Sequence, residues 1–236
     1  DLQVATNSAF DLSTGDATVE FWMNPDTQTQ TIPTLLGSID YNTSASSRIG
    51  FSQTGNTNQM FIYWNGAGNP IIASNLVMTV NQWYHIALVR QSSTLKLYIN
   101  GALDSTASVS SSLGWNLGYG GFRIGRGFDV DGANAYYKGY ISNVRIVKGT
   151  AVYTSNFTPP TSALTAISGT SILTLQNSSI VDNSTNAFSI TNNNTVTTST
   201  ATPFVANITN DTSGNNNNWL PKNINYSTSG TTYDAM

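Results

Sequence analysis

The chain has 236 residues, 39% of them hydrophobic and only 9% charged, so it can bury a sizeable core and is not a charge-rich disordered chain. Its net charge of −3 and nine scattered basic residues argue against a nucleic-acid partner, and the absence of cysteine excludes disulfide bonds and thiolate metal sites. No apolar run approaches the roughly 18 residues that a membrane helix needs, so membrane insertion is not expected.

Short strands separated by turns are predicted from the beginning of the chain. Residues 2–5 already look strand-like, and within 18–23 the apolar side chains of Val19, Phe21 and Met23 share one face. Such alternation is typical of a strand with one face in the core. Further strands are predicted at 34–39, 48–52, 59–64, 121–125 and 137–147.

The segment 83–90 is predicted to be a central strand, because both of its faces are largely apolar. His85, the only histidine, falls on the same face as Val89, which indicates a packed structural side chain. After a strand at 95–99, Asn100-Gly101 predicts a type I′ hairpin, whose two central residues need positive φ angles.

Helical periodicity is nearly absent, so at most one short helical turn is expected, near 150–156. Pro159-Pro160 ends the dense strand region. The rest is rich in Ser, Thr and Asn, but 172–175 and 188–190 still look like strands. We therefore predict an all-β, antiparallel two-sheet sandwich over residues 1–160. A C-terminal extension, 161–236, would add edge strands or link to a further module of a longer protein.

A polar motif occurs twice in the C-terminal extension. Asp182-Asn183-Ser184-Thr185-Asn186 precedes Phe188, and Asp211-Thr212-Ser213-Gly214-Asn215 precedes Trp219. Chance similarity between two loops of similar composition explains the pair as well as a repeated structural element does. Both interpretations stay open at this point.

Four segments in order carry a family resemblance: GDATVEFW at 15–22, NQWYHIALVR at 81–90, LKLYING at 95–101 and GYISNVRI at 139–146. Together they resemble the laminin-G-like members of the concanavalin-A-like lectin/glucanase superfamily. The resemblance implies a jelly-roll sandwich in which the first strand, within 2–5, pairs with a strand after residue 160.

The C-terminal extension carries a second resemblance. The runs LTLQ at 173–176, IVDNSTN at 180–186 and DTSGN at 211–215 are similar to segments that accompany this domain in structural proteins of marine bacteriophages. This resemblance implies a component of the virion surface, either a capsid decoration or a fibre protein. Its partners would then be other virion proteins, in a homo-oligomeric assembly.

The acidic residues give little support for catalysis. Glycosidases need two carboxyl groups held on either side of the scissile bond. Glu20 is the only glutamate, on an alternating strand where an outward or rim position is expected. The nearest carboxylate pair, Asp129 and Asp131, lies in a Gly-rich loop. We therefore expect no enzymatic activity.

The same loop is a candidate calcium site. Asp129, Asp131 and Asn134 offer oxygen ligands at close spacing, as Ca²⁺ requires, and Asp40 and Asn42 could add ligands. The resemblance to laminin-G-like domains, which often carry Ca²⁺ at the sandwich rim, supports this cofactor. A solvated polar turn is the alternative.

Aromatic residues beside Gly- and Asn-rich stretches are candidate glycan contacts, because sugar C–H faces pack on aromatic rings and binding residues tend to lie on loops. The set is Trp64, Trp115, Tyr119, Phe128, Tyr136 and Tyr137. Packing of these aromatics in a core or interface is the alternative.

These observations lead to a hypothesis of function. The leading interpretation is a non-enzymatic virion module that displays a lectin-like sandwich for weak adhesion to host-surface glycans. The alternative is a secreted or cell-surface bacterial carbohydrate-binding module. A glycoside hydrolase is a third and weaker reading.

Overall fold

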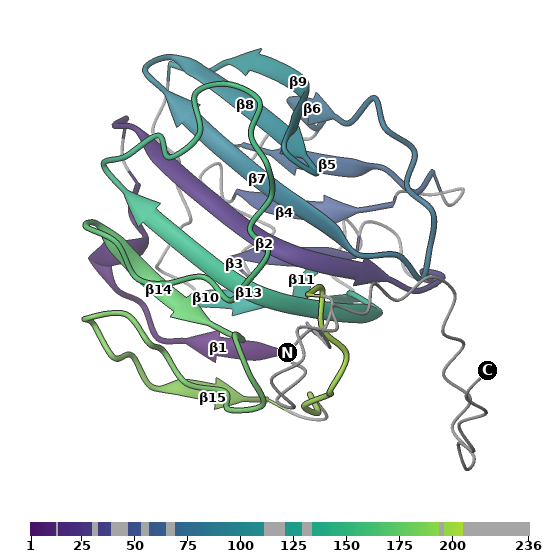
Figure 1. The fold of residues 1–236 in the computed structure, drawn as a ribbon, viewed down its shortest axis with the longest axis vertical. Coiled ribbons are helices and arrows are strands. Elements are labelled where there is room, and N and C mark those ends of the chain that lie inside the picture. The colour runs from purple at the N-terminus through teal and green to yellow at the C-terminus, as the bar shows by residue number, and fades with distance from the viewer. Residues whose placement is uncertain are drawn as a thin grey trace, which may run out of the picture. The chain divides into compact units, whose positions relative to one another are not determined.

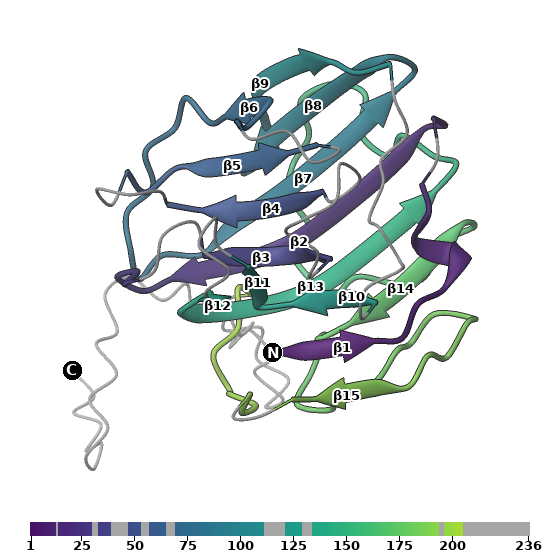
Figure 2. The same cartoon turned by 180° about the vertical axis from the view of Figure 1, so that it is seen from behind.

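Two β-sheets packed face to face make up the computed structural model (Figures 1 and 2). It describes residues 1–12, 14–29, 33–38, 47–52, 57–64, 69–110, 121–128, 134–193 and 196–204. Across these ranges the one helical element is a 3₁₀ turn, η1 (Ser8–Phe10), and no helix is long and apolar enough to cross a membrane. The helical turn expected near 150–156 is replaced by irregular backbone. The predicted antiparallel sandwich is confirmed.

The first sheet has nine strands among the described residues. Its main path runs β15 (Ile190–Asn192), β1 (Leu2–Val4), β10 (Phe122–Ile124), β3 (Thr34–Ser38), β4 (Arg48–Phe51), β5 (Met60–Tyr63) and β6 (Ile72–Ala73). The hairpin of β11 (Arg126–Phe128) and β12 (Asn134–Tyr136) joins it through a parallel contact of β12 with β3. The other pairs are antiparallel.

The second sheet has six antiparallel strands in the described part of the chain. Their order is β14 (Thr170–Thr174), β13 (Gly139–Lys148), β2 (Ala17–Pro25), β7 (Tyr84–Gln91), β8 (Thr94–Ile99) and β9 (Ala102–Ser108). Between β8 and β9, Asn100 and Gly101 have φ angles of 51° and 78°, as the predicted type I′ hairpin requires. In the long central strands β2 and β7 nearly every residue is buried, so both faces of these strands are covered.

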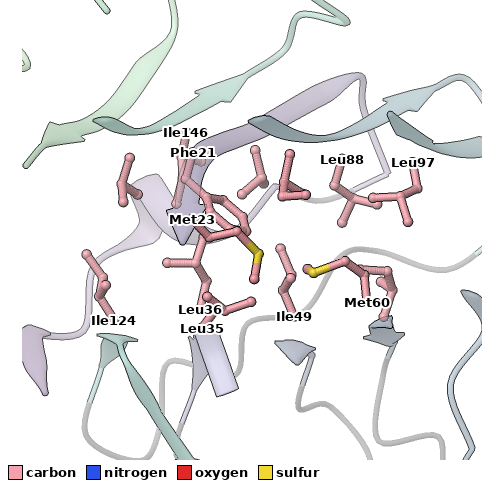
Figure 3. Close-up of a cluster of buried hydrophobic side chains, with 14 of the residues drawn as sticks. Phe21, Met23, Leu35, Leu36, Ile49, Met60, Leu88, Leu97, Ile124 and Ile146 are labelled. Carbon is pink, nitrogen blue, oxygen red and sulfur yellow. The ribbon is translucent and has the colours of Figure 1, made fainter. Parts of the chain in front are cut away.

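The core lies between the two sheets (Figure 3). Phe21, Met23, Leu88, Leu97 and Ile146 of the six-stranded sheet face Leu35, Leu36, Ile49, Met60 and Ile124 of the nine-stranded sheet. The consecutive residues Leu35 and Leu36 are both fully buried, because a register shift in the pairing of β3 with β4 inserts an extra residue there.

The Ser/Thr/Asn-rich segment supplies an edge strand to each sheet. β14 pairs with β13, and β15 pairs with β1 in the register Val4↔Ile190. The contact between the first strand and a strand after residue 160, expected from the family resemblance, is thus present. Residues up to Pro203 belong to the same compact unit as the sandwich.

Residues 149–169, here called the strap, cross the outer face of the six-stranded sheet in front of β8, β7 and β2 (Figure 1). Tyr153 and Phe157 of the strap pack on Val89 and Tyr98, and the Thr18 hydroxyl is hydrogen-bonded to the strap backbone at both Thr150 and Val152. Both faces of this sheet are therefore covered over much of its area.

Candidate functional site

A cleft of about 700 Å³ opens where β13 begins. One wall comes from the first half of β13, and another from residues 196–202, drawn in yellow-green beside β13 in Figure 1. Its aromatic lining residues are Trp83, Tyr136, Tyr137 and Tyr140. Its hydroxyl- and amide-bearing lining residues are Ser142, Gln176, Asn177, Ser178, Thr197, Thr198, Ser199, Thr200 and Thr202.

Strand register brings Trp83 and Tyr140 together. Tyr140 pairs with Asn24 across β13 and β2, and Trp83 immediately precedes Tyr84, which pairs with Met23 on the other side of β2. Tyr84 and Met23 point into the core, so Trp83 and Tyr140 project from the outer face. Their ring centroids lie 6.2 Å apart with a 40° tilt. Tyr140 is 48% exposed, which leaves its ring available to a ligand.

The adjacent residues Tyr136 and Tyr137 have different environments. Tyr136 is 41% exposed, and the Arg126 guanidinium lies 5.4 Å from its ring centre. Tyr137 packs against the core, with its ring edge toward Phe51, and burial followed by the nearby charge of Asp26 raises its pKa well above 10. Tyr136 is therefore a surface aromatic of the cleft, and Tyr137 is mainly structural.

Charge in the cleft is already compensated. Asp1 is the one acidic residue of its lining in the described structure, and its carboxylate accepts a 2.6 Å hydrogen bond from the Arg123 guanidinium. No Lys or Arg is among those lining residues. What remains of the described lining is an aromatic and hydroxyl-rich surface without an uncompensated side-chain charge.

The predicted glycan contacts lie in different parts of the protein. Tyr136 lies in the cleft. Trp64 is only 4% exposed and packs in the core beneath the Arg90 guanidinium, so it follows the alternative of core packing and is not available as a glycan contact. The side chain of Phe128, in β11, and residues Trp115 and Tyr119 fall outside the described structure.

The predicted calcium ligands are not tested by the fold. Asp129 and Asp131, like the additional candidates Asp40 and Asn42, lie outside the described residues, and Asn134 is described only as the first backbone position of β12. Within the described ranges, no three His, Asp or Glu residues gather in a way that could hold a metal ion.

Glu20 lies away from the cleft, fully buried beneath the strap. One carboxylate oxygen accepts a hydrogen bond from Arg145 Nε at 2.8 Å, and the other accepts one from the Tyr153 hydroxyl at 2.8 Å and lies 3.3 Å from His85 Nε2. Burial alone would raise the pKa of Glu20, but the hydrogen bond from His85 and the positive charge of Arg145 lower it overall. Glu20 faces the outer side of the sheet, as expected, but it is not exposed to solvent because the strap covers this face. His85 is packed and fully buried, as predicted.

The aromatic pair cannot be predicted from the sequence. Strand alternation places Trp83 on a packed face of the strand at 83–90, and Tyr140 lies within the strand predicted at 137–147. The available signals were local: Trp83 follows the polar residues Asn81 and Gln82, and Tyr140 follows Gly139. Neither signal reveals that the two rings meet across β2.

Comparisons with known proteins agree with this fold. A family model described as the concanavalin A-like lectin/glucanases superfamily matches residues 1–154. No curated protein sequence matches the chain. Among solved structures, a candidate carbohydrate-binding protein of Bacteroides ovatus aligns with a TM-score of 0.58 and 17% identity, covering 80% of this chain and 56% of its own. This chain thus spans about half of that protein.

A second similar structure is the CBM40 of Ruminococcus gnavus IT-sialidase, bound to α2,3-sialyllactose. It aligns with a TM-score of 0.45 and 12% identity, covering 61% of this chain and 80% of its own.

Proposed function

Because the chain belongs to the concanavalin A-like lectin/glucanases superfamily, we propose that it is a non-catalytic module that binds carbohydrate in the cleft beside Trp83 and Tyr140. The exposed aromatic pair is the observation that carries this proposal. Aromatic rings take the C–H faces of sugars, and hydroxyl and amide groups around them take the sugar hydroxyls. The fold likeness to the Bacteroides ovatus protein supports the same function.

The acidic groups support a role without catalysis. Hydrolysis of a glycosidic bond by the usual mechanism needs two carboxyl groups, about 5–9.5 Å apart. Of the described residues that line the cleft, only Asp1 carries one, and it is paired with Arg123. Glu20 is buried beneath the strap, where no sugar can reach it.

The proposal is tested with a glycan array. Wild-type protein is expected to bind at least one oligosaccharide, and Trp83→Ala and Tyr140→Ala are expected to weaken that binding about tenfold each, since aromatic anchors dominate such sites. Leu103→Ala is the matched control, because Leu103 is 46% exposed on β9, at the opposite edge of the six-stranded sheet from β14. Equal binding by all variants, or no binding by the wild type, would refute the proposal.

We further propose that this module is displayed on a bacteriophage particle and contacts other virion proteins and host-surface glycans. The support is the resemblance of 173–176 and 180–186 to segments of phage structural proteins. The first run contains the end of β14, and the second is hydrogen-bonded to it. The alternative remains a secreted or cell-surface bacterial module. Detection of the protein in purified particles, encoded among capsid and tail genes, is the expected result. A gene beside polysaccharide-degrading enzymes would contradict it.

A further inference from the structure

The electrostatics of the cleft restrict the class of glycan. We infer that the cleft binds an uncharged oligosaccharide and discriminates against sialylated or uronate-containing glycans; this inference rests on the proposed function. Recognition of an anionic sugar uses a cation that can turn toward the ligand, as Arg does in carboxylate sites. The described lining of this cleft contains no Lys or Arg.

Two arginines that adjoin the cleft lining are paired with Asp1. Arg123 Nη1 lies 2.6 Å from Asp1 Oδ2, and Arg126 Nη1 lies 3.9 Å from Asp1 Oδ1. The two arginine side chains are 10% and 19% exposed, and Arg126 also lies against the ring of Tyr136. A sugar carboxylate entering here would lose its hydration, approach the Asp1 carboxylate, and meet no Lys or Arg side chain in the described lining.

The polar wall suits hydroxyl groups on a neutral sugar. Residues 197–200 and 202 contribute Thr and Ser side chains that are exposed to solvent. A hydroxyl both donates and accepts hydrogen bonds, as sugar hydroxyls do, whereas a carboxylate only accepts. The aromatic pair adds apolar ring surface to the same cleft, so the cleft offers contacts for both the hydroxyl groups and the C–H faces of a neutral pyranose.

The size of the cleft favours several sugar residues. Its volume of about 700 Å³ lies in the upper part of the usual range for ligand pockets, about 300–1,000 Å³. Its lining extends from the Trp83–Tyr140 pair to Tyr136. An oligosaccharide therefore fits better than a single sugar.

The test uses paired glycans: neutral cello- and lactose-based oligosaccharides, and the same chains carrying sialic acid or a C6-oxidised residue. Affinities are measured by titration calorimetry at 0.15 M and 1 M NaCl. We expect the neutral member of a pair to bind at least about tenfold more tightly, because charge burial without a partner is costly. The affinity for the neutral member should change less than about twofold between the two salt concentrations, since no ion pair is formed. Trp83→Ala should weaken binding of the neutral member, and Leu103→Ala should not.

Two other outcomes distinguish failure of this inference from failure of the proposed function. Tighter binding of the anionic member, weakened by 1 M NaCl and by Arg126→Gln, would overturn the inference while leaving a carbohydrate-binding function in place. Failure of both members to bind, across a glycan array as well as these pairs, would overturn the proposed function together with the inference.

Discussion

Glu20 keeps its negative charge in a buried position because three neighbouring side chains hold it. Arg145 supplies the opposite charge, and His85 and Tyr153 lie within hydrogen-bond reach of the second oxygen. Because its folded-state pKa is lowered, Glu20 stabilises the fold above its ordinary pKa of 4.5, and this contribution is lost as the pH falls toward the folded-state pKa. Removing the carboxylate leaves the Arg145 charge buried without its partner.

We predict that Glu20→Gln lowers the free energy of unfolding by about 3–5 kcal/mol at pH 7, the cost typical of breaking a buried pair. The difference from wild type should shrink as the pH falls below 4.5. Urea denaturation at a series of pH values measures both effects. Asp26→Asn is the control, because the exposed pair of Asp26 with Lys138 contributes less than about 1 kcal/mol. A pH-independent difference between Glu20→Gln and wild type would contradict this account.

Single-residue environments could be predicted only where strand alternation decides them. The packed position of His85 follows from its phase with Val89, and the structure agrees. The burial of Glu20 depends on the strap, which has no periodic pattern that would predict its path. Trp64 and Trp83 illustrate the same limit, because one is buried under Arg90 and the other meets Tyr140 through register between distant strands.

At the level of elements, the β8–β9 hairpin and the strap constrain one another. Gly101 has a φ angle of 78°, and a Cβ added there would lie 1.9 Å from the carbonyl oxygen of Phe157. The Phe157 N–H also donates a 2.9 Å hydrogen bond to the Gly101 carbonyl. The Asn-Gly pair, predictable as a turn, thus has a second requirement, close contact with the strap, which no local sequence signal shows.

Gly101→Ala should destabilise the protein by about 2 kcal/mol or more, because it combines backbone strain with a backbone clash. Thermal unfolding followed by circular dichroism should show a melting temperature lower by about 4–8 °C. Two controls separate the causes. Gly125→Ala carries only the strain of a positive φ angle, and Gly15→Ala carries neither strain nor clash. If Gly101→Ala lowers the melting temperature no more than Gly125→Ala does, the strap moves away from the added methyl group without loss of stability, and this account is contradicted.

The outer edge of β14 is capped by the first copy of the repeated polar motif. The Asp182 carboxylate accepts hydrogen bonds from the backbone N–H groups of Leu173, Ser184 and Phe188. Asn186 Nδ2 donates a hydrogen bond to the Ser171 carbonyl. Hydrogen-bonding groups at a strand edge are otherwise open to pairing with another chain. The spacing of Asp, Ser and Asn in this motif recurs at 211–215, which lie outside the described residues.

Removal of the Asp182 carboxylate is predicted to destabilise the protein. Asp182→Ala should lower the free energy of unfolding by about 2–3 kcal/mol, because three backbone donors lose their acceptor. Hydrogen exchange should accelerate most at the amides of Leu173, Ser184 and Phe188. Thr185→Ala, at an exposed neighbouring position, should change stability by less than about 0.5 kcal/mol. Unchanged exchange at those three amides in Asp182→Ala would rule out the capping role.

At the scale of the whole molecule, the family match and the folded unit end at different places. The matching family model stops at residue 154, whereas the compact unit continues to Pro203. The part beyond the family match holds most of the strap and the strands β14 and β15. The sandwich itself could be predicted, because its strands alternate clearly and four motifs occur in family order. The exact contribution of 161–203 could not, since short strands there are separated by Ser-, Thr- and Asn-rich loops.

Truncation tests how far the sandwich depends on that segment. Removal of residues 161–236 takes Ile172 and Leu173 out of the core, breaks the contact of Arg145 with the Thr165 carbonyl, and leaves β1 and β13 without their edge partners. We expect this fragment to lose cooperative thermal unfolding and to bind a hydrophobic dye, as loosely packed states do. A fragment of residues 1–203 retains every one of these contacts, and its melting temperature should stay within about 2–4 °C of the full chain, the shift that 1 kcal/mol produces at this size. Cooperative unfolding of 1–160 at the full-length temperature would mean that β14 and β15 only decorate a sandwich that is already complete.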